Sequence, residues 1–296
     1  MPVAPTPDTL ASLAGDAALL HVILTRFNVP IGGREKAIRM QGAWLSERFA
    51  LFSDFCLPSV LDQTCKKFKW IIFFDRETPG EFKERIREFS AGNDQIVPYF
   101  VESWSAEIVR AAIDSVRATS HRWLLSSRLD NDDAIHERFI ESLQTNLQPE
   151  SFEYYNFPDG LIYANERLYS WEDRSNAFLS RLEPIEGFKT AWELQHPDVI
   201  RLHRVKQLGL RNAWVQNVHG TNVSNKIRGR LVRRGTWPDG YSGAPKAPLR
   251  DPGNVAFLQD RMVLHPWREF RDSAITVIKA MKRRCQMPGG SRTGGR

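Results

Sequence analysis

The chain has 296 residues, of which 42% are hydrophobic and 26% charged, and its formal net charge is +6. This composition is typical of a globular protein, and no run approaches the roughly 18 uncharged apolar residues that a membrane span needs. Residues 271–296 contain seven basic residues and one acidic residue, an excess that equals the net charge of the whole chain. The charge therefore indicates a basic tail and gives no reason to expect a nucleic acid partner.

The N-terminal segment and the cysteines predict no special chemistry. Residues 1–17 are rich in Pro, Ala and Thr and lack the basic start of a signal peptide, so we expect a flexible lead-in. Cys56, Cys65 and Cys285 show no CxxC spacing. We interpret them as reduced thiols of a cytoplasmic protein.

The first half of the chain alternates buried strands with amphipathic helices. Apolar runs predict strands over 19–27, 69–75, 95–101 and 122–129. Apolar residues at helical spacing predict helices over 44–62, after the turn 78–80, over 105–119 and over 134–147. Pro58 should kink or divide the first helix, and Asp132 or Asp133 could cap the last. This alternation predicts an α/β fold with a doubly wound, mostly parallel sheet and helices on both faces.

The second half has a different pattern. Residues 152–157 and 161–171 predict a β-hairpin whose turn is Pro158-Asp159-Gly160. Helical spacing returns over 189–209, a further strand is predicted over 213–219, and 235–254 should form a long loop. A final helix is predicted over 266–285.

Three carboxylates follow the fourth predicted strand, at Asp130, Asp132 and Asp133. Carboxylates this close repel one another, and a divalent cation is their usual reason, because hard oxygen ligands suit Mg²⁺ or Mn²⁺. A cation at a strand end of an open α/β sheet is well placed to hold a diphosphate. Asp130 and Asp132 are thus predicted to bind a metal, while negative charge at the start of a helix is an alternative reason for Asp133.

Five runs in chain order resemble one known family. The sequence is similar to the putative rhamnosyltransferase family of bacterial proteins, which has the GT-A fold. The runs that carry this resemblance are residues 24–28, 48–52 with 55–60, 70–75, 128–133 and 218–225. The resemblance implies a GT-A-like glycosyltransferase that uses a nucleotide-sugar donor and a divalent metal, Mn²⁺ or Mg²⁺.

The resemblance also implies roles for individual residues. Thr25 and Arg26, at the end of the first strand, and Asp75, at the end of the second, match positions that contact the nucleotide. Asp130 and Asp132 match the metal-binding DxD motif, and His219 matches a histidine that contacts the metal or diphosphate.

Several of these residues have a structural alternative. His219 could instead satisfy a backbone carbonyl, and Asp75 could start a turn. Arg26 and Arg128 could clamp phosphate or form salt bridges with the acidic cluster. Asn222 could bind phosphate or sugar hydroxyls, or fix its own loop.

The catalytic base is the least defined element. Candidates that could deprotonate an acceptor hydroxyl are Asp159, Glu183, Glu186, His196 and Asp198, among which we favour Glu183 and Asp198. The last helix has an apolar face that includes Phe270 and Ala274, and a basic face that includes Lys279 and Lys282. It is predicted either to lie on an anionic membrane surface or to pack on the domain.

We therefore expect residues 18–265 to form one GT-A-like domain. Its nucleotide-binding half is 18–133, its acceptor half is 134–265, and a basic amphipathic helix and tail occupy 266–296. The expected activity moves a sugar, rhamnose by the family name, from a nucleoside diphosphate to a glycan or lipid-linked glycan. The expected location is cytoplasmic, with peripheral contact to the inner membrane. The rivals are a metal-dependent phosphohydrolase or nuclease and a non-catalytic glycan-binding domain.

Overall fold

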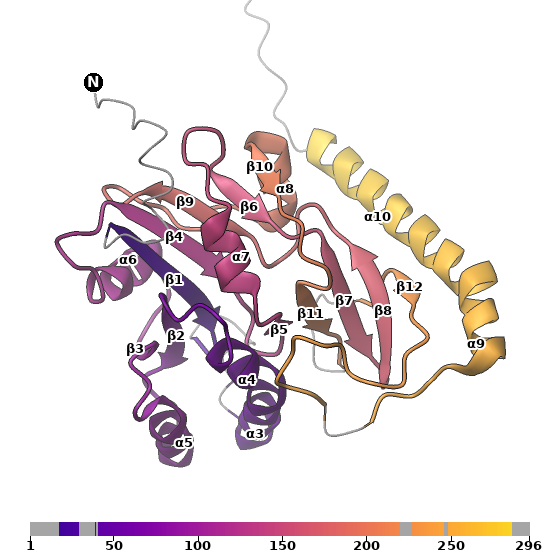
Figure 1. Ribbon diagram of the computed structural model, residues 1–296, viewed down its shortest axis with the longest axis horizontal. Helices are drawn as coiled ribbons and strands as arrows, with labels where there is room; N and C mark the ends of the chain where they lie inside the picture. The colour runs from indigo at the N-terminus through magenta and orange to yellow at the C-terminus, as the bar shows by residue number, and fades with distance from the viewer. Residues whose placement is uncertain (1–17, 30–38, 40, 220–225, 246–247, 286–296) are drawn as a thin grey trace, which may run out of the picture.

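A computed structural model describes residues 18–29, 39, 41–219, 226–245 and 248–285, with side chains up to residue 275. It contains two β-sheets that lie next to each other, with helices packed around the first (Figure 1). The predicted lead-in 1–17 lies outside the described residues.

The first sheet has the order β10-β6-β9-β4-β1-β2-β3. Its parallel part is formed by β1 (Leu19–Arg26), β2 (Lys69–Asp75), β3 (Ile96–Val101) and β4 (Trp123–Arg128). The other strands are β9 (Ser180–Pro184), which runs antiparallel to β4 and β6 (Tyr154–Asn156), and β10 (Val205–Gln207), which runs parallel to β6. The predicted α/β class with a mostly parallel central sheet is confirmed.

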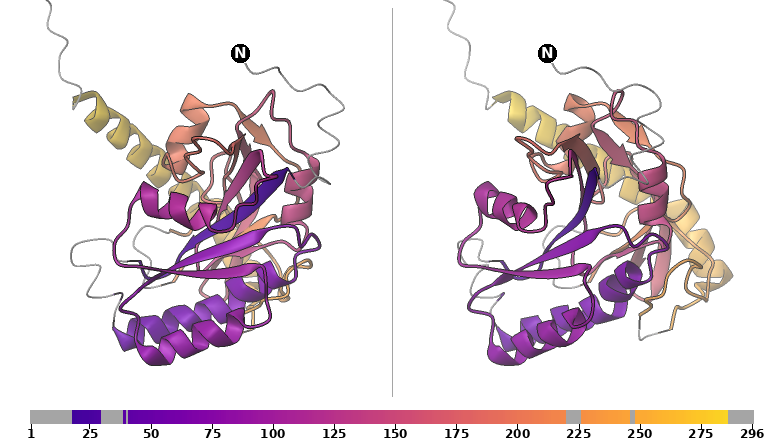
Figure 2. Two further views of the ribbon diagram at one scale, coloured as in Figure 1. Left: turned by 90° about the vertical axis from the view of Figure 1, so that its left-hand side faces the viewer. Right: turned by 60° about the vertical axis from the view of Figure 1, so that its left-hand side comes forward.

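Alternating side chains of the central strands form a core on each face of this sheet. Ile23, Trp70 and Ile72 pack on one face against the helices α3 (Gly42–Leu51), α5 (Gly80–Ser90) and α7 (Phe139–Thr145). Val22 and Ile71 pack on the other face against α6 (Ala106–Asp114). Figure 2 shows the sheet between these two helical layers. Helices on both faces were predicted, and strands that are buried on both sides explain the continuous apolar runs.

The predicted helix 44–62 is a continuous helical stretch with a π-helical turn inside it. After α3 come η1 (Phe52–Cys56) and α4 (Leu57–Leu61), with Pro58 in the first turn of α4. A proline lacks the N–H of a normal helical hydrogen bond, and the wider turn before it accommodates that loss. The irregularity expected at Pro58 is therefore present.

The predicted helix 134–147 is shorter than expected, and the predicted cap is wrong. The short strand β5 (Ala134–Ile135) comes first, and the N-cap of α7 is Arg138. Ala134 and Ile135 pair with β11 (Trp214–Asn217), about 80 residues away. Asp132 and Asp133 therefore cap no helix, because a long-range strand pairing overrides the local helical pattern.

The second sheet has the order β12-β8-β7-β11-β5. Its hairpin joins β7 (Asp159–Ala164) to β8 (Arg167–Glu172) and turns at Asn165 and Glu166, both of which have positive φ. The predicted turn at 158–160 is thus wrong, since Asp159 and Gly160 belong to β7. The helix predicted over 189–209 is shorter than expected: it covers only α8 (His196–Leu202) and is followed by β10.

The C-terminal part forms one long helical run along the outside of the second sheet (Figure 1). It consists of α9 (Gly253–Gln259), the π-helical η2 (Asp260–Leu264) and α10 (His265–Cys285). The predicted last helix is present, and the helical run starts 13 residues earlier than expected. Its inner side lies beside β12 (Arg230–Leu231).

Candidate active site

The acidic loop follows β4 at the carboxyl edge of the parallel sheet. Asp130 is exposed, whereas Asp132 is only 4% exposed and Asp133 only 1%. The three carboxylates do not converge, because the Asp133 side chain turns toward the second sheet and accepts a hydrogen bond from the Asn217 N–H at 2.9 Å. The loop therefore connects the two sheets and presents Asp130 at the surface.

Asp132 is held by two cationic or polar groups from distant parts of the chain. Its Oδ2 accepts hydrogen bonds from Arg48 Nη1 at 2.6 Å and pairs with His219 Nε2 at 2.9 Å. Burial alone would raise the pKa of Asp132, but the contacts with His219 and Arg48 outweigh it and lower that pKa. Asp132 is therefore ionised in this arrangement.

Asp133 has the opposite electrostatic character. Burial and the negative charges of Asp132 and Asp130 raise its pKa well above the usual range. Its Oδ2 is buried and has no hydrogen-bond partner among the described residues. The same burial and the same carboxylates raise the pKa of the Cys56 thiol, which donates to the Asp130 carbonyl at 3.6 Å. Asp133 thus acts as a buried support of the loop.

Two arginines flank Asp130. Arg26 ends β1 and Arg128 ends β4, and these strands are neighbours. The surrounding protein and the charge of Asp132 raise the pKa of Asp130, while Arg128 and Arg26 act against that shift. Burial lowers the pKa of Arg128, and its Nη1 donates to the Leu194 carbonyl at 3.4 Å. Arg26 and Arg128 thus share one neighbourhood with Asp130, as predicted for this edge.

A cavity of about 410 Å³ opens beside Arg26. Two of its walls are the indole rings of Trp104 and Trp192, which meet edge to face with centroids 5.4 Å apart. The Arg26 guanidinium lies 5.5 Å from the Trp192 ring centroid. Arg26 thus lies against the aromatic wall of the cavity and also acts electrostatically on Asp130.

The residues predicted to contact the nucleotide differ in how they are placed. Thr25 is completely buried and its hydroxyl accepts a hydrogen bond from the Trp70 indole at 2.9 Å, so its side chain serves the core and not the edge. Asp75 uses Oδ1 to start the next turn, through the Glu77 N–H at 2.8 Å. Its buried Oδ2 has no partner among the described residues. Asn222 lies outside the described residues.

Both favoured base candidates are engaged in contacts with neighbouring residues. Both oxygens of Glu183 accept backbone N–H groups, from Lys189 at 3.0 Å and Thr190 at 2.8 Å, and burial raises its pKa. Glu183 also pairs in register with Leu124, near the start of β4, which is the opposite end from Asp130. Asp198 pairs with Arg201 at 3.0 Å within α8. The sequence could not show this, because the strand register decides it.

The structure points to His196, which the sequence only included among several candidates. Its Nδ1 lies 2.6 Å from the Ser175 carbonyl, and since a carbonyl only accepts, Nδ1 carries the proton. The Ser175 hydroxyl donates in return to the His196 carbonyl. Nε2 makes no hydrogen bond with any described residue. The charges of His196, Asp130 and Arg128 act on one another, so the imidazole belongs to the same neighbourhood.

Arg48 is a second residue that sequence reasoning missed. It lies in a run that carries the family resemblance, yet the sequence assigned it no role. It contacts Asp132 at 2.6 Å and Asn131 at 3.4 Å, across more than 80 residues of chain. Arg48 is a charged residue within an amphipathic helix, and the local pattern does not indicate that it contacts the acidic loop.

The acidic residues fit part of a divalent metal site. An octahedral cation with ligands at about 2.1 Å has neighbouring ligands about 3 Å apart. Asp132 Oδ2 and His219 Nε2 lie 2.9 Å apart, close to that spacing, whereas the Asp133 side chain turns toward the second sheet. Among the described residues, no three His, Cys, Asp or Glu side chains are arranged to hold an ion. The predicted set of Asp130, Asp132 and His219 is therefore only partly assembled.

A parallel α/β sheet with an acidic loop and two arginines at its carboxyl edge has the features expected of an enzyme that binds a nucleotide sugar. The comparison with protein families agrees with this class. The chain belongs to the family described as putative rhamnosyl transferase, whose model matches residues 21–231. No curated protein sequence matches the chain.

Solved structures of low identity and low TM-score match parts of the chain. TarS of S. aureus in complex with UDP-GlcNAc has 9% identity and a TM-score of 0.45, and the match covers 71% of this chain and 62% of that one. TarS in complex with UDP has 14% identity and a TM-score of 0.33, with coverage of 49% and 36%. A putative nucleotide-diphospho-sugar transferase of Desulfovibrio desulfuricans G20 has 11% identity and a TM-score of 0.35, with coverage of 67% and 80%. The match thus spans less than two thirds of either TarS chain.

Proposed function

We propose that this glycosyltransferase moves a sugar from a nucleoside diphosphate to a hydroxyl of a glycan or lipid-linked glycan. The sugar that the family name suggests is rhamnose. The observation that carries the proposal is the grouping of Asp130 with Arg26 and Arg128, which end two neighbouring parallel strands and act electrostatically on its carboxylate. Ligands of open α/β sheets bind at this edge, and paired arginines suit the oxygens of a diphosphate.

The donor occupies the edge from the acidic loop to the aromatic cavity. Arg26 and Arg128 bind the diphosphate. The nucleoside enters the cavity beside Trp104 and Trp192, whose rings offer stacking surface. The buried Oδ2 of Asp75, which has no partner among the described residues, accepts a hydrogen bond from the nucleoside.

A divalent cation is part of this proposal. Asp130, Asp132 and His219 are the residues that would hold Mn²⁺ or Mg²⁺, with oxygen and imidazole ligands. When bound, the cation neutralises the negative charge of the diphosphate. Arg48, which already contacts Asp132, keeps that carboxylate ionised and oriented.

His196 replaces Glu183 and Asp198 as the proposed base. Its neutral Nε2 takes the proton from the acceptor hydroxyl as the hydroxyl oxygen bonds to the anomeric carbon. The bond between that carbon and the diphosphate oxygen breaks, and the nucleoside diphosphate leaves with the electron pair. Such a direct displacement inverts the anomeric centre. Ser175 fixes the tautomer by accepting the Nδ1 proton at 2.6 Å.

Donor binding tests the proposed function. A thermal-shift screen of UDP, GDP and dTDP with Mn²⁺ selects the nucleotide, and calorimetry then measures its affinity for the wild type and the variant Asp130→Ala/Asp132→Ala. We expect the Mn²⁺-dependent affinity to disappear in the variant, because two of the proposed ligands are lost.

The matched control removes two carboxylates from the opposite edge of the sheet. Asp94 precedes β3 and Asp114 ends α6, so Asp94→Ala/Asp114→Ala should bind the nucleotide as the wild type does. Unchanged nucleotide affinity of the Asp130/Asp132 variant would refute the donor site.

A further inference from the structure

The helical run α9–η2–α10 has an inverted distribution of polarity. Large apolar side chains are exposed along it, beside polar residues such as Gln259, Arg261 and Glu269. We call the apolar set the outer apolar face, and it consists of Val255, Leu258, Met262, Val263, Trp267 and Phe270, which are between 58% and 81% exposed. Among the described residues, the other large hydrophobic side chains with comparable exposure are few and lie mainly on α8. Six large apolar side chains exposed on one helical run form a patch of the kind that marks an interaction surface.

Polar and charged groups secure the inner side of the same run. Asp260 and Arg268 are buried, and Arg268 Nη2 donates to Asp260 Oδ1 at 2.7 Å and to the Gly229 carbonyl at 2.9 Å. Asp260 Oδ2 also accepts from the Leu231 N–H of β12 at 3.0 Å. These contacts attach the helix to the second sheet without help from the outer apolar face.

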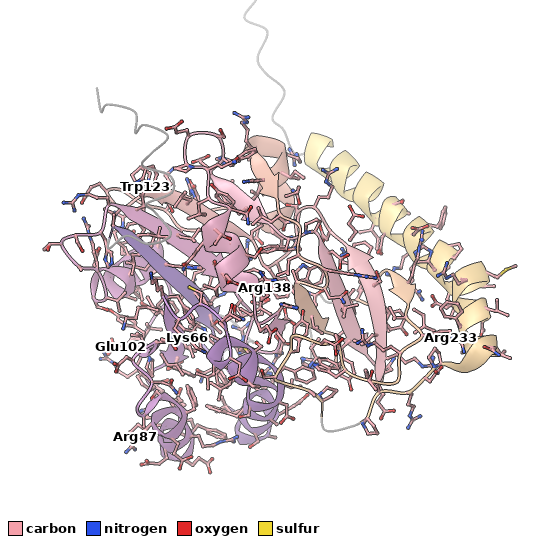
Figure 3. The ribbon with its side chains drawn as sticks, in the orientation of Figure 1. Lys66, Arg87, Glu102, Trp123, Arg138 and Arg233 are labelled. Carbon is pink, nitrogen blue, oxygen red and sulfur yellow. The ribbon has the colours of Figure 1, made fainter. Side chains whose placement is uncertain are left out.

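Basic groups accompany the outer apolar face. Figure 3 shows Arg233 beside α9, where its guanidinium lies 5.8 Å from the Phe257 ring centroid. The exposed Arg261 lies 5.1 Å from the same centroid. Further along, residues 271–296 carry seven basic residues and one acidic residue. Positive charge therefore continues from the apolar face into the C-terminal segment.

The length and polarity of this run indicate which apolar environment it meets. No described helix is long and apolar enough to cross a bilayer. An amphipathic helix with exposed aromatic residues and basic flanks lies in the plane of a bilayer surface.

We propose that the outer apolar face docks on a lipid bilayer with anionic headgroups. Trp267, Phe270 and Met262 enter the boundary between headgroups and acyl chains, and the basic residues contact the headgroup phosphates. The inference goes beyond the proposed function, since it needs neither a donor nor glycosyl transfer. Docking on the bilayer would place any lipid-linked acceptor on the side of the molecule that carries the C-terminal helix.

Vesicle co-sedimentation of the full chain tests this proposal. The vesicles contain either phosphatidylcholine alone or phosphatidylcholine with phosphatidylglycerol. We expect the wild type to sediment with the anionic vesicles, and less so as salt increases. The variant Trp267→Glu/Phe270→Glu should lower the partition coefficient by about tenfold or more, because both aromatic anchors become charged.

The matched control is Ile200→Glu/Leu202→Glu, which places the same two charges on exposed apolar positions of α8. It should bind vesicles to within about twofold of the wild type, apart from a small loss of electrostatic attraction. Circular dichroism melting of each variant verifies folding. Wild type that stays in the supernatant, or a Trp267/Phe270 variant that sediments normally, would overturn the proposal. So would a lipid-free dimer that this variant dissociates, because the face would then bind protein.

Discussion

His196 is fixed on one side of its ring and open on the other. Nδ1 donates to the Ser175 carbonyl, and the Ser175 N–H is itself held by Asp173 Oδ1 at 2.9 Å. The groups that act on the ring are therefore Ser175, Asp173, Asp130 and Arg128. Burial, with Arg128, lowers the pKa of His196 below 6.5, whereas Ser175, Asp173 and Asp130 oppose the shift. The imidazole is thus neutral at neutral pH, which a general base requires.

We predict that His196→Gln lowers kcat by roughly 10²- to 10⁴-fold while the KM for the donor changes little. The wild-type rate should fall with acid as the ring protonates, with a midpoint below pH 6.5, and the variant should lack this limb. Steady-state kinetics across pH 5–9 measures both effects. Asp198→Asn, two residues along α8, is the control and should retain the wild-type profile. An unchanged acid limb in His196→Gln would exclude the histidine as the base.

Gly160 shows how a single element can be misread from its sequence. Pro158-Asp159-Gly160 has the composition of a turn, yet Gly160 lies inside β7. The position requires glycine because a Cβ there would come within 2.2 Å of the Trp214 ring. Trp214 is 1% exposed and donates from its indole to the Phe157 carbonyl at 2.8 Å. The glycine therefore permits the packing of β11 on the hairpin.

We predict that Gly160→Ala destabilises the protein by about 1–3 kcal/mol, the range typical of overpacking in a core. Urea unfolding measures the change. Gly209→Ala serves as the control, because nothing lies within 4 Å of the Cβ that it would add. Equal stability of the two variants would show that the Trp214 contact is not limiting.

The elements that the sequence predicted well are those buried on both faces. β1, β2 and β4 are rich in apolar residues, and their order placed Asp130, Arg26 and Arg128 at the same edge of the sheet. The prediction failed where partners were distant in the chain. β5 pairs with β11, and Glu183 pairs with Leu124. No local sequence pattern specifies the register of either pairing. Thr25 was assigned to the edge although the pleat of β1 turns it toward Trp70.

His21 contributes to the stability of the whole molecule and to its dependence on pH. It belongs to β1, lies 2.9 Å from Ser127 Oγ of β4, and accepts at Nδ1 from Gln144 of α7 at 3.0 Å. Burial lowers the pKa of His21 to about 3 from the model-peptide value of 6.5. Between those values the unfolded chain binds a proton that the folded chain does not. The stability from neutral His21 is therefore complete above pH 6.5 and is lost as pH falls toward 3.

We predict that acidification from pH 6.5 to about 3 costs the wild type up to about 5 kcal/mol through this residue. His21→Gln should be less stable at pH 7, since the fit to Ser127 and Gln144 is lost, but should show a flatter decline with acid. Urea titrations at pH 7, 5.5 and 4 give the two slopes. His203→Gln, at a partly exposed site paired with Glu153, should keep the wild-type slope. Parallel curves for wild type and His21→Gln would contradict the assignment.

The acidic loop has a consequence for how this chain tolerates mutation. A scan that scores only survival would find Asp130, Asp132 and Asp133 similarly intolerant and would group them as one motif. Asp133, which receives the Asn217 N–H of the second sheet, should instead behave as a temperature-sensitive position that recovers in the cold. The exposed Asp130 side chain makes no such hydrogen bond to the second sheet among the described residues. Cooling should therefore not restore the function of a variant that lacks Asp130. Three acids within four residues are thus expected to respond differently to mutation, because Asp133 links the two sheets whereas Asp130 is exposed.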